Sequence, residues 1–376
     1  MNKNYNFNRI QLLSLASLIF LSPALRLFPN SAAEYASQAA AFSALAAIPL
    51  ILLYLLFICR FMDFRKDGEG MAELIMRCLG PKAGKAALGI LSLWFLFYAA
   101  FILRVGSDRL ITTIYPHSSP ALFIIVMALI CSISALGAAR TIVRAAKLLL
   151  PFIFGIIIFI LLFASFSISG KNLLPVSISD TLPIFISSLS SFDIFTAVLY
   201  LICFFAPFVK RSENSFKAYS IWVLIMSAFI SWLCIAVVGS FGAELSAKLS
   251  WPFFSLVRNL VFFNSLERIE ALVVSIWVFP DFLLVSMLLY SAQYCLRLSL
   301  GEKSPEYRGE KMFSTINKRF MIPLCGVLII ISGLFMAKSP ENLEFFSKTL
   351  IPLINFAFAL LFLPGIFIYG KAKNKL

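Results

Sequence analysis

Ten apolar stretches, each about twenty residues long, follow one another along this 376-residue chain and limit its possible folds more than any other feature. A transmembrane helix needs about 20 consecutive apolar residues, whereas a membrane-spanning strand needs about ten residues of alternating polarity. The stretches here are of the longer kind and do not alternate. Helices also satisfy their own backbone hydrogen bonds within a bilayer. The sequence therefore predicts an all-α polytopic membrane protein.

The charged residues between the apolar stretches set the expected helix boundaries. We expect ten transmembrane helices, at 9–28, 37–60, 84–106, 119–138, 145–168, 187–209, 218–241, 266–296, 320–337 and 348–370. They form a single permease-like domain over residues 1–376, with half-repeats at about 9–168 and 187–370. Because each half has an odd number of spans, the second half is inverted relative to the first. The sequence thus predicts a five-plus-five inverted repeat.

Composition supports a membrane protein and argues against a nucleic-acid partner. Hydrophobic residues make up 61% of the chain and charged residues only 13%, about half the share in a soluble protein. The net charge of +14 comes from Lys and Arg in short loops between the apolar stretches, and no basic stripe with interleaved aromatic residues is present. Most of the 32 basic residues fall on one side of the expected bilayer, which places both termini in the cytoplasm. The expected surroundings are membrane lipid.

No pattern in the sequence predicts an enzyme, a metal site or a cofactor. The seven cysteines are scattered, mostly within apolar stretches, without CxxC spacing, and there is one histidine. We find no nucleophile with a neighbouring base, no phosphate-binding loop and no pair of carboxylates at acid–base spacing.

Two interruptions occupy corresponding places in the two halves. Pro23 removes a helix hydrogen bond within the first span, and residues 187–193 (SSLSSFD) form a polar stretch at the start of the sixth. Broken helices at corresponding positions point to a ligand site near the bilayer midplane, although prolines and serines also occur in ordinary membrane helices. We therefore expect helices 1 and 6 to be broken. The candidate ligand-binding residues at these breaks are Ser22, Pro23, Ala24, Ser190 and Ser191.

Ionisable residues inside spans are costly and are candidates for function. Asp193 either meets a ligand ammonium or a cation, or caps the helix after the serines. Asp281 follows Pro280 in the eighth span and is expected to be a cation or proton site, or else a packing hydrogen bond. Arg104 either pairs with Asp193 or Glu270, holds a ligand carboxylate, or extends to the interface. Arg26 and Tyr98 are secondary candidates.

Several short motifs resemble those of one known family. Residues 172–176 (NLLPV) precede the sixth span, and Lys210-Arg211 follow it. Trp251-Pro252, residues 267–270 (ERIE) and Trp277 then occur in order. This series resembles the endospore germination permease family, the B subunit of nutrient germinant receptors. The sequence departs from the family pattern at both interruptions, where it has no glycine.

The resemblance implies a fold like that of the amino acid–polyamine–organocation transporters, in the spore inner membrane. It implies partners, namely receptor A and C subunits, and a small nutrient as ligand, with an amino acid expected first. Glu267, Arg268 and Glu270 belong to the best-matching block and are expected to form a gate or subunit contact. The alternative is that the two glutamates simply stabilise the start of the eighth span.

Three functions remain open on these observations. The first is a germinant receptor subunit that senses a nutrient and signals to its partners. The second is an amino-acid secondary transporter coupled to an ion gradient, which would depend on Asp281 or Asp193. The third is a structural subunit of a membrane complex without a ligand of its own. It would keep its germinant preference after substitution of Ser22, Asp193 and Arg104.

Overall fold

The computed structural model describes residues 8–66, 69–137, 139–209, 215–259, 269–301, 316–336 and 340–373, and these are helical nearly throughout. The first half contains α1 (Arg9–Ala36), α2 (Ala40–Ala46), α3 (Ile48–Asp63), α4 (Met71–Leu79), α5 (Pro81–Thr113), α6 (Pro120–Leu136) and α7 (Ala139–Ser165). The second half contains α8 (Thr181–Ile202), α9 (Ser215–Phe241), α10 (Ala243–Lys248), α11 (Pro252–Asn259), α12 (Ile269–Ser299), α13 (Ile316–Phe335), α14 (Pro340–Phe345), α15 (Ile351–Phe356) and α16 (Leu363–Ala372).

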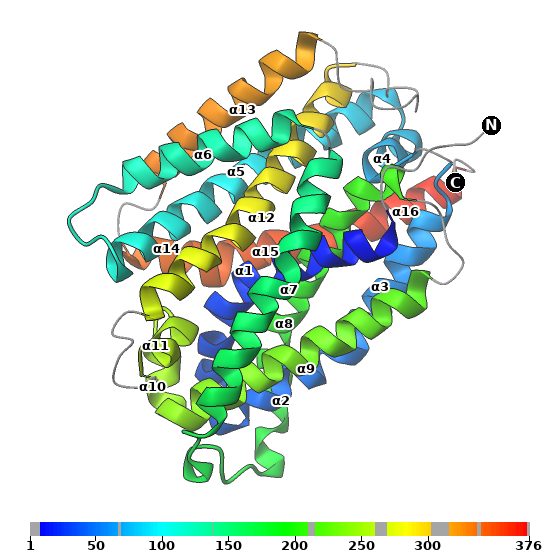
Figure 1. Ribbon diagram of the computed structural model, residues 1–376. Coiled ribbons are helices and arrows are strands. Elements are labelled where there is room, and N and C mark those ends of the chain that lie inside the picture. The colour runs from blue at the N-terminus through cyan, green and yellow to red at the C-terminus, as the bar shows by residue number, and fades with distance from the viewer. Residues whose placement is uncertain are drawn as a thin grey trace.

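The order of apolar helices confirms the expected all-helical membrane fold. Within the described part, 7 helical segments are long and apolar enough to cross a membrane, and two shorter apolar helices accompany them. The first segment, Arg9–Asp63, has 55 residues and contains two expected spans. The chain turns between them at Ser37, which has a φ of 48°. The start of α1 and the end of α16 lie at the same end of the bundle, as an even number of spans requires (Figure 1).

Helix packing pairs the spans of the two halves. Extensive contacts join α1 to α8, α2 and α3 to α9, α5 to α12, and α6 to α13 (Figure 1). Each pair joins a span to its counterpart in the other half. The fifth span departs from this pairing, since the main contacts of α7 are with α1.

The two expected interruptions differ from the prediction. Helix α1 remains helical through Pro23, and α8 remains helical from residue 187 to Asp193. A proline inside a membrane helix removes one backbone hydrogen bond without ending the helix when neighbouring groups compensate. Departures from α-geometry occur elsewhere. A 3₁₀ turn (Cys203–Phe208) follows α8, and two π-helical turns (Phe346–Leu350 and Ala357–Phe362) interrupt the last span.

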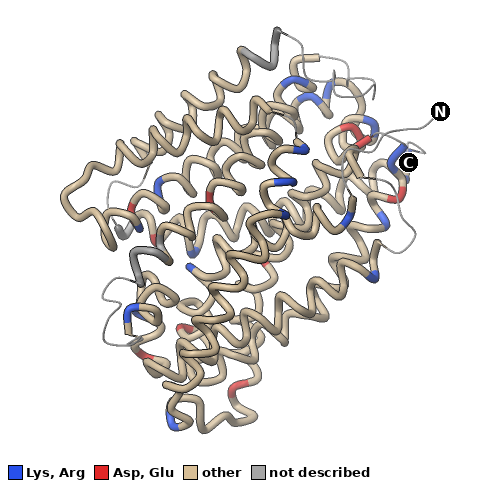
Figure 2. Tube along the Cα trace, viewed as in Figure 1, with Lys and Arg blue, Asp and Glu red and all other residues tan. Residues whose placement is uncertain are grey.

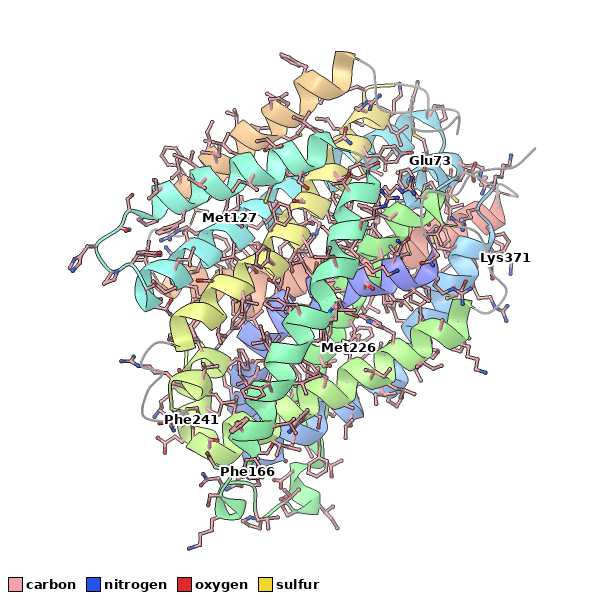
Figure 3. All side chains as sticks on the ribbon, viewed as in Figure 1. Glu73, Met127, Phe166, Met226, Phe241 and Lys371 are labelled. Atoms are coloured by element: carbon pink, nitrogen blue, oxygen red, sulfur yellow. The ribbon has the colours of Figure 1, made fainter. Side chains whose placement is uncertain are left out.

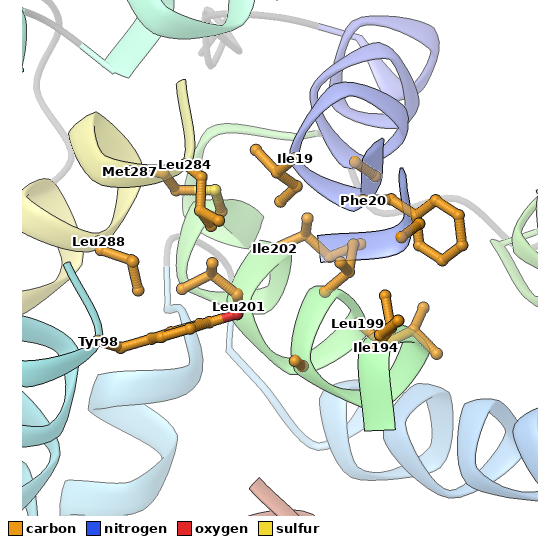
Figure 4. Packing of buried hydrophobic residues seen from close by; sticks show 14 of the residues in the cluster. Ile19, Phe20, Tyr98, Ile194, Leu199, Leu201, Ile202, Leu284, Met287 and Leu288 are labelled. Atoms are coloured by element: carbon orange, nitrogen blue, oxygen red, sulfur yellow. The ribbon is translucent and has the colours of Figure 1, made fainter. Parts of the chain in front are cut away.

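The core lies where α1, α5, α8 and α12 meet. Each helix contributes buried side chains to this region (Figure 4). They are Ile19 and Phe20 of α1, Tyr98 of α5, residues 194–202 of α8 and Leu284–Leu288 of α12. The ring of Phe20 lies 4.6 Å from that of Phe195, and Trp222 on α9 packs against both. Aromatic pairs of this kind fix the distance between helices where lipid provides no hydrophobic driving force.

One hydrogen bond in this core allows a direct test of the packing. The indole of Trp222 donates to Ser17 Oγ at 2.9 Å and so links α9 to α1. We expect Trp222→Phe and Ser17→Ala each to lower the free energy of unfolding, with a coupling of roughly 0.5–1.5 kcal/mol. A double-mutant cycle in detergent measures it. Additive single effects would contradict a direct contact.

Charged residues lie mostly toward the two ends of the bundle, and the middle of most helices carries few of them (Figure 2). The end away from the termini includes the short helices α10 and α11. Helix α11 packs on α12, α1 and α9. Asn30 on α1 donates to the carbonyls of Ala247 (2.6 Å) and Leu249 (3.0 Å), which holds the connection between the two short helices on the bundle.

Candidate functional site

A cavity of about 550 Å³ opens at the end of the bundle away from the termini. It lies between the second half of α1, α5, the α10–α11 connection and the start of the last span. Its volume falls in the range of small-molecule sites, about 300–1,000 Å³. We call it the vestibule.

Ion pairs hold the rim of the vestibule. Lys348 donates to Glu34 at 2.7 Å and pairs with Glu344 at 2.9 Å, which joins the last span to α1. Lys248 on α10 pairs with Glu244 at 2.7 Å, and this pair is exposed. The lysines of the rim are therefore already matched by carboxylates.

Arg26 forms the floor of the vestibule. Its side chain is buried, with 6% of its surface exposed, yet it lines the cavity. It donates through Nη1 to Ser347 Oγ at 2.8 Å, and its guanidinium lies 5.3 Å from the centre of the Phe101 ring.

A buried ion pair lies deeper between α1, α5 and α12. Asp281 accepts from Arg109 Nη2 at 2.6 Å and from Ser22 Oγ at 2.5 Å, so both of its oxygens are engaged. The Arg109 guanidinium also lies 4.7 Å from the centre of the Trp277 ring. Gly106 allows this close approach, since a Cβ there would stand 3.3 Å from Asp281 Oδ2.

Sequence reasoning missed Arg109 as a site residue. The third span was expected to end at residue 106, whereas α5 continues to Thr113 and carries Arg109 into the bundle. A buried carboxylate in the eighth span requires a cationic or hydrogen-bonding partner. That requirement was the signal available, but it could not identify which arginine supplies the charge.

Asp193 occupies a second buried polar cluster, between α8 and α15. It hydrogen-bonds the side chain of Asn355, and its Oδ1 has no hydrogen-bond partner among the described residues. Tyr200 donates to Asn355 Oδ1 at 3.0 Å and accepts from the Trp94 indole at 3.4 Å. Tyr98 interacts electrostatically with both Asp193 and Arg26.

The remaining predicted residues lie on α1, α5 and α8 or near the start of α12. Arg104 interacts electrostatically with Asp108, one turn along α5. Pro23 and Ala24 are buried in α1, as is Ser191 in α8, while Ser190 is half-buried. Glu267 and Arg268 lie outside the described residues. Glu270 falls in the first turn of α12, but its side chain is not described. The structure therefore brings together Ser22 and Asp281 and leaves the expected gate residues untested.

The end of the bundle that carries the termini is held by α4. Tyr294 on α12 donates to Glu73, and the backbone N–H of Gly70 donates to the same carboxylate at 2.9 Å. Arg65, before α4, donates to the carbonyl of Ala206 at 2.5 Å, in the turn that follows α8. Figure 3 places Glu73 and Lys371 at this end and Phe241 at the other. A cavity of about 110 Å³ lies at the same end.

Comparison with solved structures shows which fold this is. The chain is similar to a Na⁺-coupled sialic acid symporter in a substrate-bound outward-open state, with a TM-score of 0.61 and 15% identity over 97% of this chain and 81% of that one. It is also similar to a nucleobase-cation-symport-1 family transporter in a closed conformation with bromovinylhydantoin bound, with a TM-score of 0.61 and 13% identity over 98% and 80% of the two chains. These likenesses establish a transporter fold.

Sequence comparison shows the family. The chain is 23% identical over 206 residues to the spore germination protein GerQB of Bacillus cereus, a match that covers 55% of this chain and 52% of that relative. The match thus spans about half the length of the relative. The family model described as spore germination protein matches residues 7–341. The helical membrane fold and this match over nearly the whole chain agree with the resemblance seen in the sequence, and the chain belongs to the spore germination protein family of permeases.

Proposed function

We propose that the chain is the permease subunit of a spore germinant receptor, which senses a small nutrient and signals to partner subunits. An amino acid is the nutrient expected first. The proposed location is the spore inner membrane, with both termini in the cytoplasm and the vestibule facing outward. The proposed partners are the receptor A and C subunits. Family membership and the similarity to GerQB support a role in germination.

One observation carries the proposal of a bound nutrient. The vestibule ends on two buried polar side chains, Arg26 of α1 and Ser347 of the last span, which lie beside the Phe101 ring of α5. Pockets with a few convergent polar groups are the usual small-molecule sites of membrane transporters and receptors. A nutrient bound there signals only if it binds two arrangements of the bundle with unequal affinity. Such a change would alter two regions, the vestibule and the opposite end of the bundle, where α4 packs.

The ion pair of Asp281 favours sensing over ion-coupled transport. Both oxygens of Asp281 accept short hydrogen bonds, from Arg109 and Ser22. A coupling cation at this carboxylate would have to displace a fixed guanidinium. Asp193 is the other buried aspartate among the candidate residues. One of its oxygens has no hydrogen-bond partner among the described residues, so it could meet a cation or a ligand ammonium.

The test is germination of spores that lack this chain. Dipicolinate release is scored across a panel of amino acids, with sugars and nucleosides included. We expect loss of the response to one nutrient and its return on complementation. A response that persists for every nutrient when other receptors are also deleted would overturn the proposal.

Point variants in the complemented strain separate the alternatives. Ser22→Ala and Asp193→Asn are expected to raise the nutrient concentration needed for germination, while Lys171→Gln, at an exposed lysine outside the vestibule lining, leaves it unchanged. An unchanged preference in every site variant, with normal assembly, would instead indicate a structural subunit. Concentrative uptake of labelled amino acid that depends on Asp193 would indicate a transporter.

A further inference from the structure

The guanidinium of Arg26 is a buried cation whose described contacts, at the floor of an open cavity, are with neutral groups. These contacts are the hydroxyl of Ser347 and the ring of Phe101. Among the described ion pairs, Lys348 meets two carboxylates, Lys248 meets one, and Arg109 meets Asp281. Asp108, which also lines the cavity, interacts electrostatically with Arg104. Arg26 is therefore the one of these cations whose described hydrogen bonds and ion pairs include no carboxylate.

Burial of a charge without a counter-charge is costly, particularly within a membrane. Asp281 is the carboxylate that acts electrostatically on Arg26, but Asp281 is already paired with Arg109. The floor of the vestibule consequently carries a positive charge, whereas Lys348 with its two carboxylates leaves one negative charge at the rim. An anion that enters the cavity would offset this charge in a place where water screens it poorly.

The geometry around Arg26 suits a carboxylate. The guanidinium has five N–H donors in a planar fork, of which one is used by Ser347. Because Ser347 Oγ accepts from Arg26, its own hydrogen is free to donate to a second acceptor. Phe101 covers the guanidinium face, so an incoming group approaches the edge that carries the donors. Ser347 lies in the π-helical turn Phe346–Leu350, and such turns are frequent at functional sites.

We propose that Arg26 and Ser347 form a carboxylate subsite, in which Arg26 pairs with the carboxylate of a small organic acid or amino acid and Ser347 donates to it. The inference rests on the proposed nutrient site and names the group by which that site recognises its ligand. It also makes Arg26 the residue that selects for a negative charge among molecules in the vestibule.

The test uses full-length protein in detergent that carries the substitution Leu27→Cys, because Leu27 lines the vestibule beside Arg26. We measure the rates at which the introduced thiol reacts with an anionic and with a cationic methanethiosulfonate reagent. The protein without the Leu27→Cys change is the blank, since six of its seven native cysteines are buried. Arg26→Gln is expected to lower the anionic-to-cationic rate ratio about fivefold or more. Lys171→Gln, at an exposed lysine that is not part of the vestibule lining, is expected to leave the ratio unchanged.

Competition identifies the group that binds. L-Alanine and propionate are expected to slow modification of the introduced thiol by a neutral thiol reagent, while L-alaninamide and propionamide do not. Arg26→Lys serves as a second variant if Arg26→Gln does not fold, as judged by its elution profile. It should keep the rate ratio and weaken carboxylate protection, because one ammonium cannot replace the planar fork.

The outcomes separate this inference from the proposed function. The carboxylate subsite is overturned if Arg26→Gln leaves the anionic-to-cationic rate ratio unchanged, or if acids and amides protect the introduced thiol equally. Either result counts even if the deletion strain fails to germinate. Charge-dependent rates and acid-selective protection in a protein whose deletion leaves germination intact would support the subsite and overturn the sensing role.

Discussion

Asp281→Ala is expected to lower the free energy of unfolding by about 3–5 kcal/mol, the usual cost of removing one partner of a buried ion pair. The side chain of Arg109 is 1% exposed, so the variant leaves a guanidinium in the bundle without its counter-charge. Ser22 loses its acceptor in the same change. The remaining contact of Arg109 with Trp277 offsets only part of this loss.

Unfolding by denaturant in mixed micelles measures the effect. A double variant, Asp281→Leu with Arg109→Met, is expected to recover most of the stability, since replacing a buried ion pair by apolar residues is often neutral. Glu244→Ala removes half of an exposed pair and is the matched control, with no expected change. Equal losses in the double variant and in Asp281→Ala would show that the ion pair itself, rather than a stranded charge, supplies the stability.

Glu73→Gln is expected to remove a pH dependence of stability between about pH 4.5 and 7. Burial raises the pKa of Glu73, which lies in α4 outside the membrane-spanning helices, from 4.5 to about 7. The folded state therefore favours the protonated carboxyl. Its contribution to stability is complete below pH 4.5 and is lost as pH rises to about 7, and the total loss is roughly 3 kcal/mol.

Thermal or denaturant unfolding of the wild type and Glu73→Gln from pH 4 to 8 measures this slope. The variant should have a flatter profile and should be the more stable protein at pH 8. Glu344→Gln is the matched control, because Glu344 lines the vestibule at the other end of the bundle and its side chain is exposed. It should retain the slope.

A second variant tests the origin of this pH dependence. Tyr294 donates to the Glu73 carboxylate, a hydrogen bond that favours the charged form. Tyr294→Phe removes this bond, so the pKa of Glu73 should rise further and the loss of stability should extend to higher pH. If the stability of the wild type and of Glu73→Gln changes with pH in parallel between pH 4.5 and 7, Glu73 does not titrate in that range.

The sequence by itself determined the membrane fold, the order of the spans, the family and the two buried aspartates that are candidates for function. These follow from properties of single residues and short windows. An apolar stretch of about twenty residues must span lipid as a helix, and Asp193 and Asp281 are costly in that position wherever their neighbours lie.

Only the tertiary structure decided which side chains meet. Arg109 and Asp281 are 172 residues apart, and their contact depends on the length and rotation of α5 against α12, which no local pattern specifies. The same holds for Arg26, whose neutral partners come from α5 and a π-helical turn of the last span. Pro23 predicted a broken helix because it removes a backbone donor, but the surrounding packing keeps α1 helical. Hydrophobicity places a residue at a membrane depth, whereas the packing of distant helices determines its partner.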